Sequence, residues 1–467
     1  MAVSAGRSSC RAEYPYNCRL VFVAEQQQQQ RVESEFRQWQ SEQQQQEQRK
    51  FRPRCPGFYT NTHLPSTWFR VLGFLEFAMQ LELFNDSIPL EDIFEAYYEC
   101  RKHKRNRPGS LQFEIDLEKN LVELWEEINS GSWEPRHSTV FIVDKPVTRE
   151  IFAASFRDRI VHHLVIGRLN ALFEKLFIYD SYSCRKGKGT HFGISRAEHF
   201  IRRTEKAWVL KIDIRGYFMS INRSLLYKKL EIFINKNYHA IDKERIKKLC
   251  KVIIFNDPAK NCVFHSPPIK WKNLPKDKSL FTAKKDCGLP IGNLTSQIFA
   301  NFYLNDFDHF IKNECAIKNY GRYVDDCLLV HNSLGYLKNL IPKIKKYLKN
   351  NLHLKLHPNK IYIQPAYNGV KYLGCFIKPT HTVINHRTVK NLKRALYLYN
   401  KIAIDHKPDT AERDKFVSSI NSYLGIMKHY KTYKKRQKIL MNNVSPLWYK
   451  HIAVSSNAFQ KIIKRMC

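Results

Sequence analysis

The amino-acid sequence predicts an α+β fold, because segments typical of strands and of helices follow one another without a strict β-α-β alternation. The clearest strand is the apolar run 208–214, which carries Asp213 near its end. The clearest helix is 158–178, where apolar residues recur at the spacing of one helix face. A hairpin is predicted over 320–331, with Asp325 and Asp326 at its bend. These patterns indicate a sheet with helices packed beside it.

The first 60 residues differ in composition from the rest of the chain. Twelve of the 23 residues from 26 to 48 are glutamine, which is typical of low-complexity sequence. We therefore expect 1–60 to be a disordered extension. A short amphipathic helix is the alternative, since Val32, Phe36 and Trp39 lie at helical spacing.

Two helices and a strand are predicted between residues 84 and 143. The first helix begins after Pro89, and the proline and glycine at 107–109 predict a break. A second helix is expected over 111–127. The apolar segment 139–143 predicts a strand.

The rest of the chain is also expected to mix helices and strands. A helix after the strand 208–214 is predicted to be capped by Asn222, and 251–287 is predicted to be rich in loops. The remaining expected elements are a helix from Ser296, a helix at about 336–350, strands near 355–364 and 369–377, and a Lys-rich helical tail from 386.

The net charge of +35 is concentrated in the later part of the chain. Residues 1–50 carry a net charge of +1 and residues 51–130 a net charge of −4, so residues 131–467 carry +38. A surface this basic repels itself unless a polyanion is near, and 29 Phe, 24 Tyr and 7 Trp add stacking groups. Nucleic acid is the expected partner.

The cysteines and the hydropathy pattern indicate a cytoplasmic protein. None of the twelve cysteines forms a Cys-x-x-Cys pair, which argues against a zinc ribbon and a disulfide framework. No apolar run approaches the ~20 residues of a membrane helix. We therefore expect a reducing compartment and no membrane partner.

Three carboxylates lie in strongly apolar surroundings. Asp213 ends one predicted strand, and Asp325 and Asp326 lie in a second strand pair. Buried carboxylates need counter-charge, and ligand sets made only of oxygen favour Mg²⁺ or Mn²⁺ over zinc. Two such ions about 4 Å apart can activate a hydroxyl and stabilise a leaving pyrophosphate. An ordinary hairpin turn remains the alternative reading of Asp325 and Asp326, because Asp favours turns.

From about Leu90 to Tyr430 the chain resembles a reverse transcriptase. Examples are Gly-Leu-Pro-Ile-Gly-Asn-Leu-Thr-Ser-Gln at 288–297 and Tyr-Val-Asp-Asp at 323–326. The similar blocks occur in the order of that family, at 141–149, 157–163, 181–190, 213–218, 288–297, 323–326, 357–360 and 370–374. The resemblance implies a right-hand polymerase with N-terminal helices and fingers over 84–207, a palm with an antiparallel sheet over 208–378 and a helical thumb over 379–467.

The resemblance also assigns the chemistry of the carboxylates. It implies that Asp213, Asp325 and the backbone carbonyl of Ile214 bind two Mg²⁺ ions, with Mn²⁺ as an alternative. Asp326 would tune the site and could reach a metal. The implied activity is RNA-directed DNA polymerisation, with dNTPs as substrates.

Further positions match family residues that approach the nucleotide. Phe218 matches a steric gate against the ribose 2′-hydroxyl, or it is a core residue. Lys360 matches a lysine proposed to protonate pyrophosphate, or it is a surface lysine. The resemblance places Lys145, Arg149 and Arg185 near the triphosphate or the template, and a surface ion pair is the alternative for each. Template or primer contacts are implied for Lys186, Lys188, Gly292, Tyr323, Leu373 and Gly374.

One departure from most of the family has a functional implication. Ser296-Gln297 replaces the usual Ser-Pro, and this form, with the tail 418–430, is similar to the reverse transcriptases of diversity-generating retroelements. The resemblance implies error-prone copying at template adenines and partners that are a structured template RNA, a cDNA or DNA primer and a small, basic, oligomeric accessory variability protein. It further implies a bacterial or phage origin. Gln297 adds an amide near the nascent base pair, and we hypothesise that it loosens base selection.

Two other functions remain open at this stage. One is a reverse transcriptase used in phage defence, which could share the Ser-Gln form. The other is a maturase-like RNA-binding protein that has lost polymerisation, although the intact Asp213, Asp325 and Asp326 argue against it.

Overall fold

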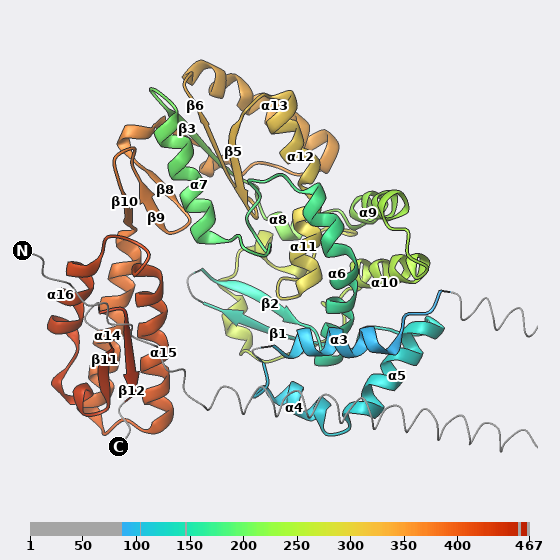
Figure 1. The fold of residues 1–467 in the computed structure, drawn as a ribbon, viewed down its shortest axis with the longest axis horizontal. Coiled ribbons are helices and arrows are strands. Elements are labelled where there is room, and N and C mark those ends of the chain that lie inside the picture. Colours follow the sequence, from blue (N-terminus) through green and yellow to red (C-terminus); the bar gives the residue numbers. More distant parts are fainter. Residues whose placement is uncertain (1–85, 103, 145–146, 456–458, 465–467) are drawn as a thin grey trace, which may run out of the picture. The chain divides into compact units, whose positions relative to one another are not determined.

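The structure is a computed structural model and describes residues 86–464, apart from 103, 145–146 and 456–458. The expected extension 1–60 and Lys145 lie outside the described residues. The α+β class is confirmed, since helices and four separate sheets are present among these residues (Figure 1). No helix in the described part of the chain is long and apolar enough to cross a membrane.

The first helices follow the prediction with one correction. Helix α3 (Leu90–Arg101) starts directly after Pro89, and α6 (Phe156–Leu176) is the expected long helix, capped by the Ser155 side chain. The single helix expected over 111–127 is instead two helices, α4 (Pro108–Glu114) and α5 (Leu117–Ser130). The chain leaves helical geometry at Asp116, a residue type that favours caps over helix interiors.

A small sheet follows these helices in sequence. The predicted strand is β1 (Ser138–Val143), which pairs antiparallel with β2 (Arg149–Ala153) and parallel with β4 (Cys262–Phe264). The sequence analysis missed β2 and β4. Strand β4 lies inside the segment 251–287 that was predicted to be rich in loops, which also contains the end of a helix, up to Phe255, and the short 3₁₀ turns at Pro268–Trp271, Lys276–Lys278 and Leu280–Thr282.

The central sheet carries the predicted hairpin. Its strands are β3 (Trp208–Asp213), β5 (Asn319–Tyr323), β6 (Asp326–His331) and β7 (Tyr362–Pro365), antiparallel in the order β5-β6-β3-β7. Alternate residues of β3 and β6 enter different cores, so both faces of the sheet are covered. This explains why 208–214 is an apolar run rather than an alternating one.

Helices cover the two faces of this sheet. On one face, α7 (Thr190–Arg203), which the sequence analysis missed, packs through Ile194, Ala197 and Phe200 against Val209 and Leu328. The other face belongs to the main core. The helices that contribute to that core include α8 (Tyr217–Ser220), α9 (Arg223–Asn237), α10 (Lys243–Phe255), α11 (Leu294–Tyr303), α12 (Asn305–His309) and α13 (Leu334–Leu352). The Asn222 side chain accepts a hydrogen bond from the Leu225 backbone N–H, as expected of a cap for α9.

Two predictions near the end of the chain need correction. The strand expected over 355–364 is only β7, because the chain from 358 to 360 forms a 3₁₀ turn. The strand expected over 369–377 is a hairpin, and its strands β8 (Val370–Tyr372) and β9 (Cys375–Ile377) join β10 (Thr382–Ile384) in a separate sheet.

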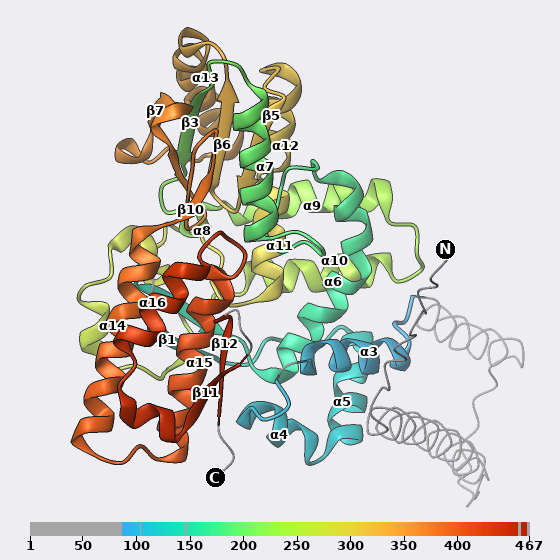
Figure 2. The same cartoon turned by 60° about the vertical axis from the view of Figure 1, so that its left-hand side comes forward.

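The tail is helical to Asn443 and has a core of its own (Figure 2). Its helices are α14 (His386–Asp405), α15 (Thr410–Met427) and α16 (Tyr433–Asn443). The sequence analysis missed the hairpin that follows, β11 (Ile452–Ser455) with β12 (Lys461–Lys464). The Asn421 side chain binds the backbone N–H and C=O of Ile462 at 2.8 Å, which attaches the hairpin to α15. The domain limits expected at 207 and 378 stay predictions.

Candidate active site

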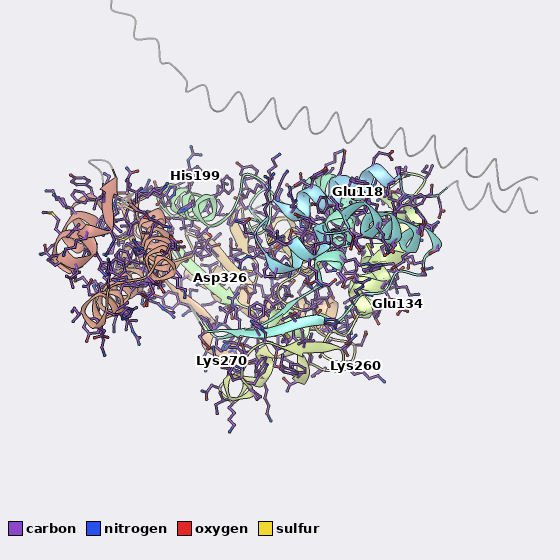
Figure 3. The ribbon with its side chains drawn as sticks, turned by 90° about the horizontal axis from the view of Figure 1, so that it is seen from below. Glu118, Glu134, His199, Lys260, Lys270 and Asp326 are labelled. Carbon is purple, nitrogen blue, oxygen red and sulfur yellow. The ribbon has the colours of Figure 1, made fainter. Side chains whose placement is uncertain are left out.

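Neighbouring strands of the central sheet bring the three predicted aspartates together. Asp213 is the last residue of β3 and is directly paired with Asp326, the first residue of β6. Asp325 precedes Asp326 in the turn that joins β5 to β6. We call residues 319–331 the two-aspartate hairpin, and Figure 3 labels Asp326 within it. Ile214, whose backbone carbonyl is the fourth predicted ligand, follows Asp213 and forms an isolated antiparallel β-bridge with Leu356.

The turn of this hairpin contains an unusual backbone conformation. Tyr323 pairs with Asp326, which leaves Val324 and Asp325 as a two-residue loop. Val324 has φ of +57°, a region that a β-branched residue rarely adopts. Such strain persists only where the surroundings hold it, and it is common at functional sites. Here a buried side chain supplies that support.

Arg322 is the buried group that holds the turn. Its side chain has no exposed surface, and its guanidinium donates to the carbonyl oxygen of Val324 at 2.8 Å. It also forms a bidentate ion pair with Asp308, with Nε–Oδ1 of 2.7 Å and Nη2–Oδ2 of 2.6 Å. Asp308 is fully buried and accepts a further bond from the Tyr320 hydroxyl at 2.6 Å. The network therefore ties α12 and β5 to the strained turn.

The three aspartates lie in a strongly negative environment that two lysines offset in part. Lys360 Nζ donates to Asp213 Oδ2 at 2.7 Å, and Lys211 Nζ lies 3.1 Å from Asp326 Oδ2. Burial, followed by the charge of Asp213, raises the pKa of Asp325 to about 6. Burial also raises the pKa of Asp326, and Lys211 opposes that shift. Within the described residues Asp326 Oδ1 is buried without a hydrogen-bond partner.

These carboxylates suit a cation chemically. The donor set is all oxygen, and the site combines a carboxylate of raised pKa with a buried carboxylate oxygen that has no partner, so bound positive charge would relieve both costs. In the described part of the chain, however, no group of three or more His, Cys, Asp or Glu side chains has the geometry of a metal site. Asp213, Asp325, Asp326 and the Ile214 carbonyl are the residues that could hold such ions.

The loop before α11 brings other predicted residues close to β2 and to the 181–189 loop. Gly292 has φ of +132°, and a Cβ there would lie 2.6 Å from the carbonyl oxygen of Phe152. Glycine at this position is therefore needed for contact with β2, whatever else it approaches. Gln297 Oε1 accepts a bond from the Cys184 thiol at 2.9 Å, a contact that the sequence did not indicate.

The structure gives Arg185 internal partners instead of an open phosphate site. Its guanidinium pairs with Glu174 at 2.8 Å and donates to the carbonyls of Ile178 and Ser181. This is the ion-pair alternative to the expected nucleotide contact, although the pair is mostly buried rather than on the surface. Lys188 Nζ lies 4.3 Å from the centre of the Tyr179 ring, whereas Lys186 and Arg149 are exposed.

The remaining predicted residues lie on the central sheet and near it. Phe218 is half-buried and packs against the main core, as its structural alternative required. Tyr323 is half-buried in β5. Leu373 and Gly374 form the turn between β8 and β9 with φ of +45° and +87°, which is the sign that a tight type I′ hairpin turn requires at both positions. The functional roles expected for these residues stay predictions.

Sequence reasoning missed four residues that shape the site: Lys211, Asn301, Asp308 and Arg322. Arg322 immediately precedes the Tyr-Val-Asp-Asp motif, and a charged residue within the predicted hairpin was the available signal. Nothing in the sequence pairs it with Asp308 in advance. Asn301 contributes its side-chain oxygen to Arg322 at 3.3 Å and donates to the Ser183 carbonyl at 2.7 Å, so it joins the hairpin to the 181–189 loop.

An antiparallel sheet that presents acidic side chains at the ends of adjacent strands is the kind of site that binds divalent cations and phosphates. Comparison with known families gives the finer class. The model described as "Reverse transcriptase (RNA-dependent DNA polymerase)" matches residues 144–377, half of the chain. The chain belongs to this family.

Individual relatives are distant. The COX1/OXI3 intron 1 protein of Saccharomyces cerevisiae is 22% identical over 284 residues, which cover 58% of this chain and 30% of that protein. Protein YkfC of Escherichia coli is 21% identical over 304 residues, covering 56% of this chain and 72% of YkfC. Nuclear intron maturase 4, mitochondrial, of Arabidopsis thaliana is 22% identical over 218 residues, covering 45% and 23%. The chain thus spans less than a third of the intron 1 protein and of the maturase.

Among solved structures, apo telomerase from Candida tropicalis aligns with a TM-score of 0.41 at 12% identity, covering 70% of this chain and 65% of that chain. Telomerase from Candida albicans in complex with a fragment of telomeric RNA aligns with a TM-score of 0.39 at 13% identity, covering 66% and 55%.

Proposed function

We propose that this chain is an RNA-directed DNA polymerase that makes cDNA from an RNA template. The observation that carries the proposal is the two-aspartate hairpin, which places Asp325 and Asp326 beside Asp213 on a strained turn that buried Arg322 supports. Family membership makes this reaction the natural use of such a site. Carboxylates kept at the edge of a core, against their desolvation cost, favour catalysis over a purely structural role.

Divalent cations are part of the proposal. Asp213, Asp325 and the Ile214 carbonyl would hold two Mg²⁺ ions, or Mn²⁺, with Asp326 tuning the site. When bound, the ions supply Lewis acidity toward the primer hydroxyl and the leaving pyrophosphate. Lys360, whose Nζ donates to Asp213, lies beside these ligands, and its ammonium would donate a proton to the departing pyrophosphate.

We further propose that the enzyme serves a diversity-generating retroelement and copies template adenines with errors. The Ser296-Gln297 pair supports this, and the proposal includes structured template RNA, a cDNA or DNA primer, dNTPs and a small basic oligomeric accessory protein as partners of a cytoplasmic enzyme that is bacterial or phage-encoded. The Gln297 side chain accepts a hydrogen bond from the Cys184 thiol, so its amide has a defined position on α11, the helix that follows the loop expected to meet the template base. Restoring proline, Gln297→Pro, is expected to lower the adenine error rate.

An RNA-binding role without polymerisation is the second candidate, because a nuclear intron maturase is among the relatives. A reverse transcriptase of phage defence is the third, and it would give faithful cDNA. One experiment separates them: extension of a DNA primer on an RNA template by the purified full chain with Mg²⁺ and dNTPs, followed by sequencing of the cDNA.

We expect cDNA from the wild type with substitutions concentrated at template adenines. Faithful cDNA would support the defence role and overturn the mutagenic one. If Gln297→Pro leaves the adenine errors unchanged, the assigned role of Gln297 is wrong. No cDNA from the wild type, even with the cognate RNA and the accessory protein present, would favour the RNA-binding role.

A further inference from the structure

A group of exposed aromatic rings lies on the segment 256–287, outside the two-aspartate hairpin. Phe264 at the end of edge strand β4 is 53% exposed, and Phe281 is 40% exposed. Their rings are nearly parallel, with centroids 5.6 Å apart and an interplanar angle of 11°. Trp271 meets Phe264 edge-on at 5.2 Å. We call these three rings, together with the lysines of 256–287, the aromatic–lysine surface.

A buried carboxylate anchors this surface to the small sheet. Glu150 on β2 has no exposed surface and accepts three hydrogen bonds, all from the segment. The donors are Trp271 Nε1 at 2.8 Å, the Ser279 hydroxyl at 2.9 Å and the Leu280 backbone N–H at 2.7 Å. The rings are thereby held in place before any partner binds, which reduces the entropy lost on binding.

The charge of the segment selects the kind of partner. Residues 256–287 contain seven lysines and three aspartates. Lys260 and Lys270 have carboxylate partners, Asp257 and Asp144. The other exposed lysines have no carboxylate within salt-bridge distance among the described residues: Lys272, Lys276, Lys284 and Lys285. Exposed rings surrounded by unpaired lysines fit a polyanion that also has flat apolar groups.

Contacts connect this surface to the active site on two sides. Phe281 lies 5.6 Å from Phe152, whose backbone N–H binds the carbonyl of Ile291 beside Gly292. Asp277 pairs with Arg215, two residues after Asp213, at 3.1 Å. In the view of Figure 3, Lys260 and Lys270 lie at the rim of the molecule on the far side of the β1–β2 hairpin from Asp326. The aromatic–lysine surface is thus in contact with residues next to Gly292 and next to Asp213.

We propose that the aromatic–lysine surface binds single-stranded RNA, the unpaired template ahead of the base being copied. Phe264 and Phe281 stack on bases, and the lysines neutralise phosphates, a combination that tolerates any sequence. The inference deepens the proposed function and rests on it, because it assigns the bound strand to the template. A protein partner is less suited, because the lysines around the rings would lose hydration without gaining a regular array of anions.

The test measures binding of the full chain to a fluorescent 20-nucleotide unstructured RNA and to a blunt DNA–RNA duplex by anisotropy. Phe264→Ala and Phe281→Ala are each expected to weaken binding to the single strand by about tenfold and to leave the duplex within about twofold, since stacking acts on unpaired bases. Phe255→Ala is the matched control, because Phe255 has similar exposure outside the surface. The double variant Lys272→Ala/Lys276→Ala should reduce the slope of log K against log salt concentration by about 1–2 in magnitude. The control is the double variant Lys345→Ala/Lys346→Ala, which removes two lysines outside the surface.

The inference would be overturned if Phe264→Ala and Phe281→Ala bound the single strand as tightly as the control Phe255→Ala does. It would also be overturned if they lost as much affinity for the blunt duplex as for the single strand. Unchanged RNA binding together with a loss of self-association in sedimentation would reassign the surface to a protein contact and also overturn it. Each variant's melting temperature must match the wild type, and Phe264→Leu is the substitute if Phe264→Ala unfolds. Primer extension by the wild type is scored separately, so failure of the polymerase proposal is distinguishable from failure of this one.

Discussion

The two-aspartate hairpin and the aromatic–lysine surface each depend on a buried carboxylate, but the two carboxylates are satisfied differently. Asp308 beneath the hairpin is matched by the full charge of Arg322, also completely buried. Glu150 beneath the aromatic–lysine surface accepts hydrogen bonds from three uncharged donors: an indole N–H, a hydroxyl and a backbone N–H. Charge pairing fixes the strained turn of the hairpin, while neutral donors fix a long loop. The comparison indicates that each functional region is organised by an acid that does not itself react.

Two acids in and beneath the hairpin have opposite roles. Asp308 is compensated by protein, whereas Asp325 has a pKa raised to about 6 by burial and by Asp213. A group that folding disfavours in its charged form is a candidate for a role outside folding. Substitution should therefore separate the two acids: one removes activity and the other removes stability.

The largest expected effect is on catalysis. Asp325→Asn should lower the rate of single-turnover primer extension by roughly 1,000-fold, because several kcal/mol of metal-dependent stabilisation are lost while the shape is kept. Asp306→Asn, an exposed acid of the same region, is the control and should leave the rate unchanged. A rate for Asp325→Asn within tenfold of the wild type would remove Asp325 from the active site.

The next largest effect is expected on the stability of the two-aspartate hairpin. Arg322→Met leaves Asp308 buried without counter-charge, and the free energy of unfolding should fall by about 3–5 kcal/mol. Urea denaturation with the double variant Arg322→Met/Asp308→Leu measures the coupling, and the double variant should recover a large part of the loss. The single variant Asp308→Leu completes the comparison. If the double variant loses as much free energy of unfolding as the two single variants added together, the pair does not organise the turn.

A smaller effect is expected at the aromatic–lysine surface. Glu150→Gln keeps the size of the side chain but replaces an acceptor oxygen with an N–H₂ that faces donors, at a cost of about 1–3 kcal/mol. Hydrogen exchange of residues 268–282 should accelerate, while that of 319–331 should not. Glu126→Gln on the exposed side of α5 provides the comparison. Equal exchange in both regions would contradict the separation drawn between them.

The smallest effect is a pH dependence in metal-free solution. Since the pKa of Asp325 is raised from 3.8 to about 6, the folded state favours the protonated acid, and this stabilisation is present below pH 4 and is lost as pH rises through about 6. In EDTA at pH 7, Asp325→Asn should therefore be more stable than the wild type by about 1–2 kcal/mol. Melting curves at pH 4 and pH 7 check this, and a gap of the same size at both values would contradict it.

Local patterns were sufficient for much of the fold. The apolar runs at 158–178 and 208–214, the cap at Asn222 and the hairpin at 320–331 each reflect interactions among residues close in sequence, although the bend lies at 324–325, one residue before the predicted 325–326. The strands β2, β4, β11 and β12 were missed because each is short, between three and five residues, and β4 in addition pairs with a strand far away in the sequence, β1.

The candidate site was likewise predictable in part from the sequence. The order of the motifs was enough to nominate Asp213, Asp325 and Asp326, and the structure pairs Asp213 with Asp326 on neighbouring strands and places Asp325 in the adjoining turn. Arg185 shows the limit of that reasoning: its residue type suits phosphate, yet Glu174 and two carbonyls take up its guanidinium.

The sequence by itself determined the basic charge, the α+β class, the acids and the family motifs, because these depend on residue type and on spacing along the chain. Only the tertiary structure decided which charges are compensated and which remain open to a ligand. Arg322 and Asp308 are 14 residues apart, while Glu150 binds donors more than 120 residues away. Such partners are chosen by packing in three dimensions, and the desolvation that makes them matter exists only after the chain has folded.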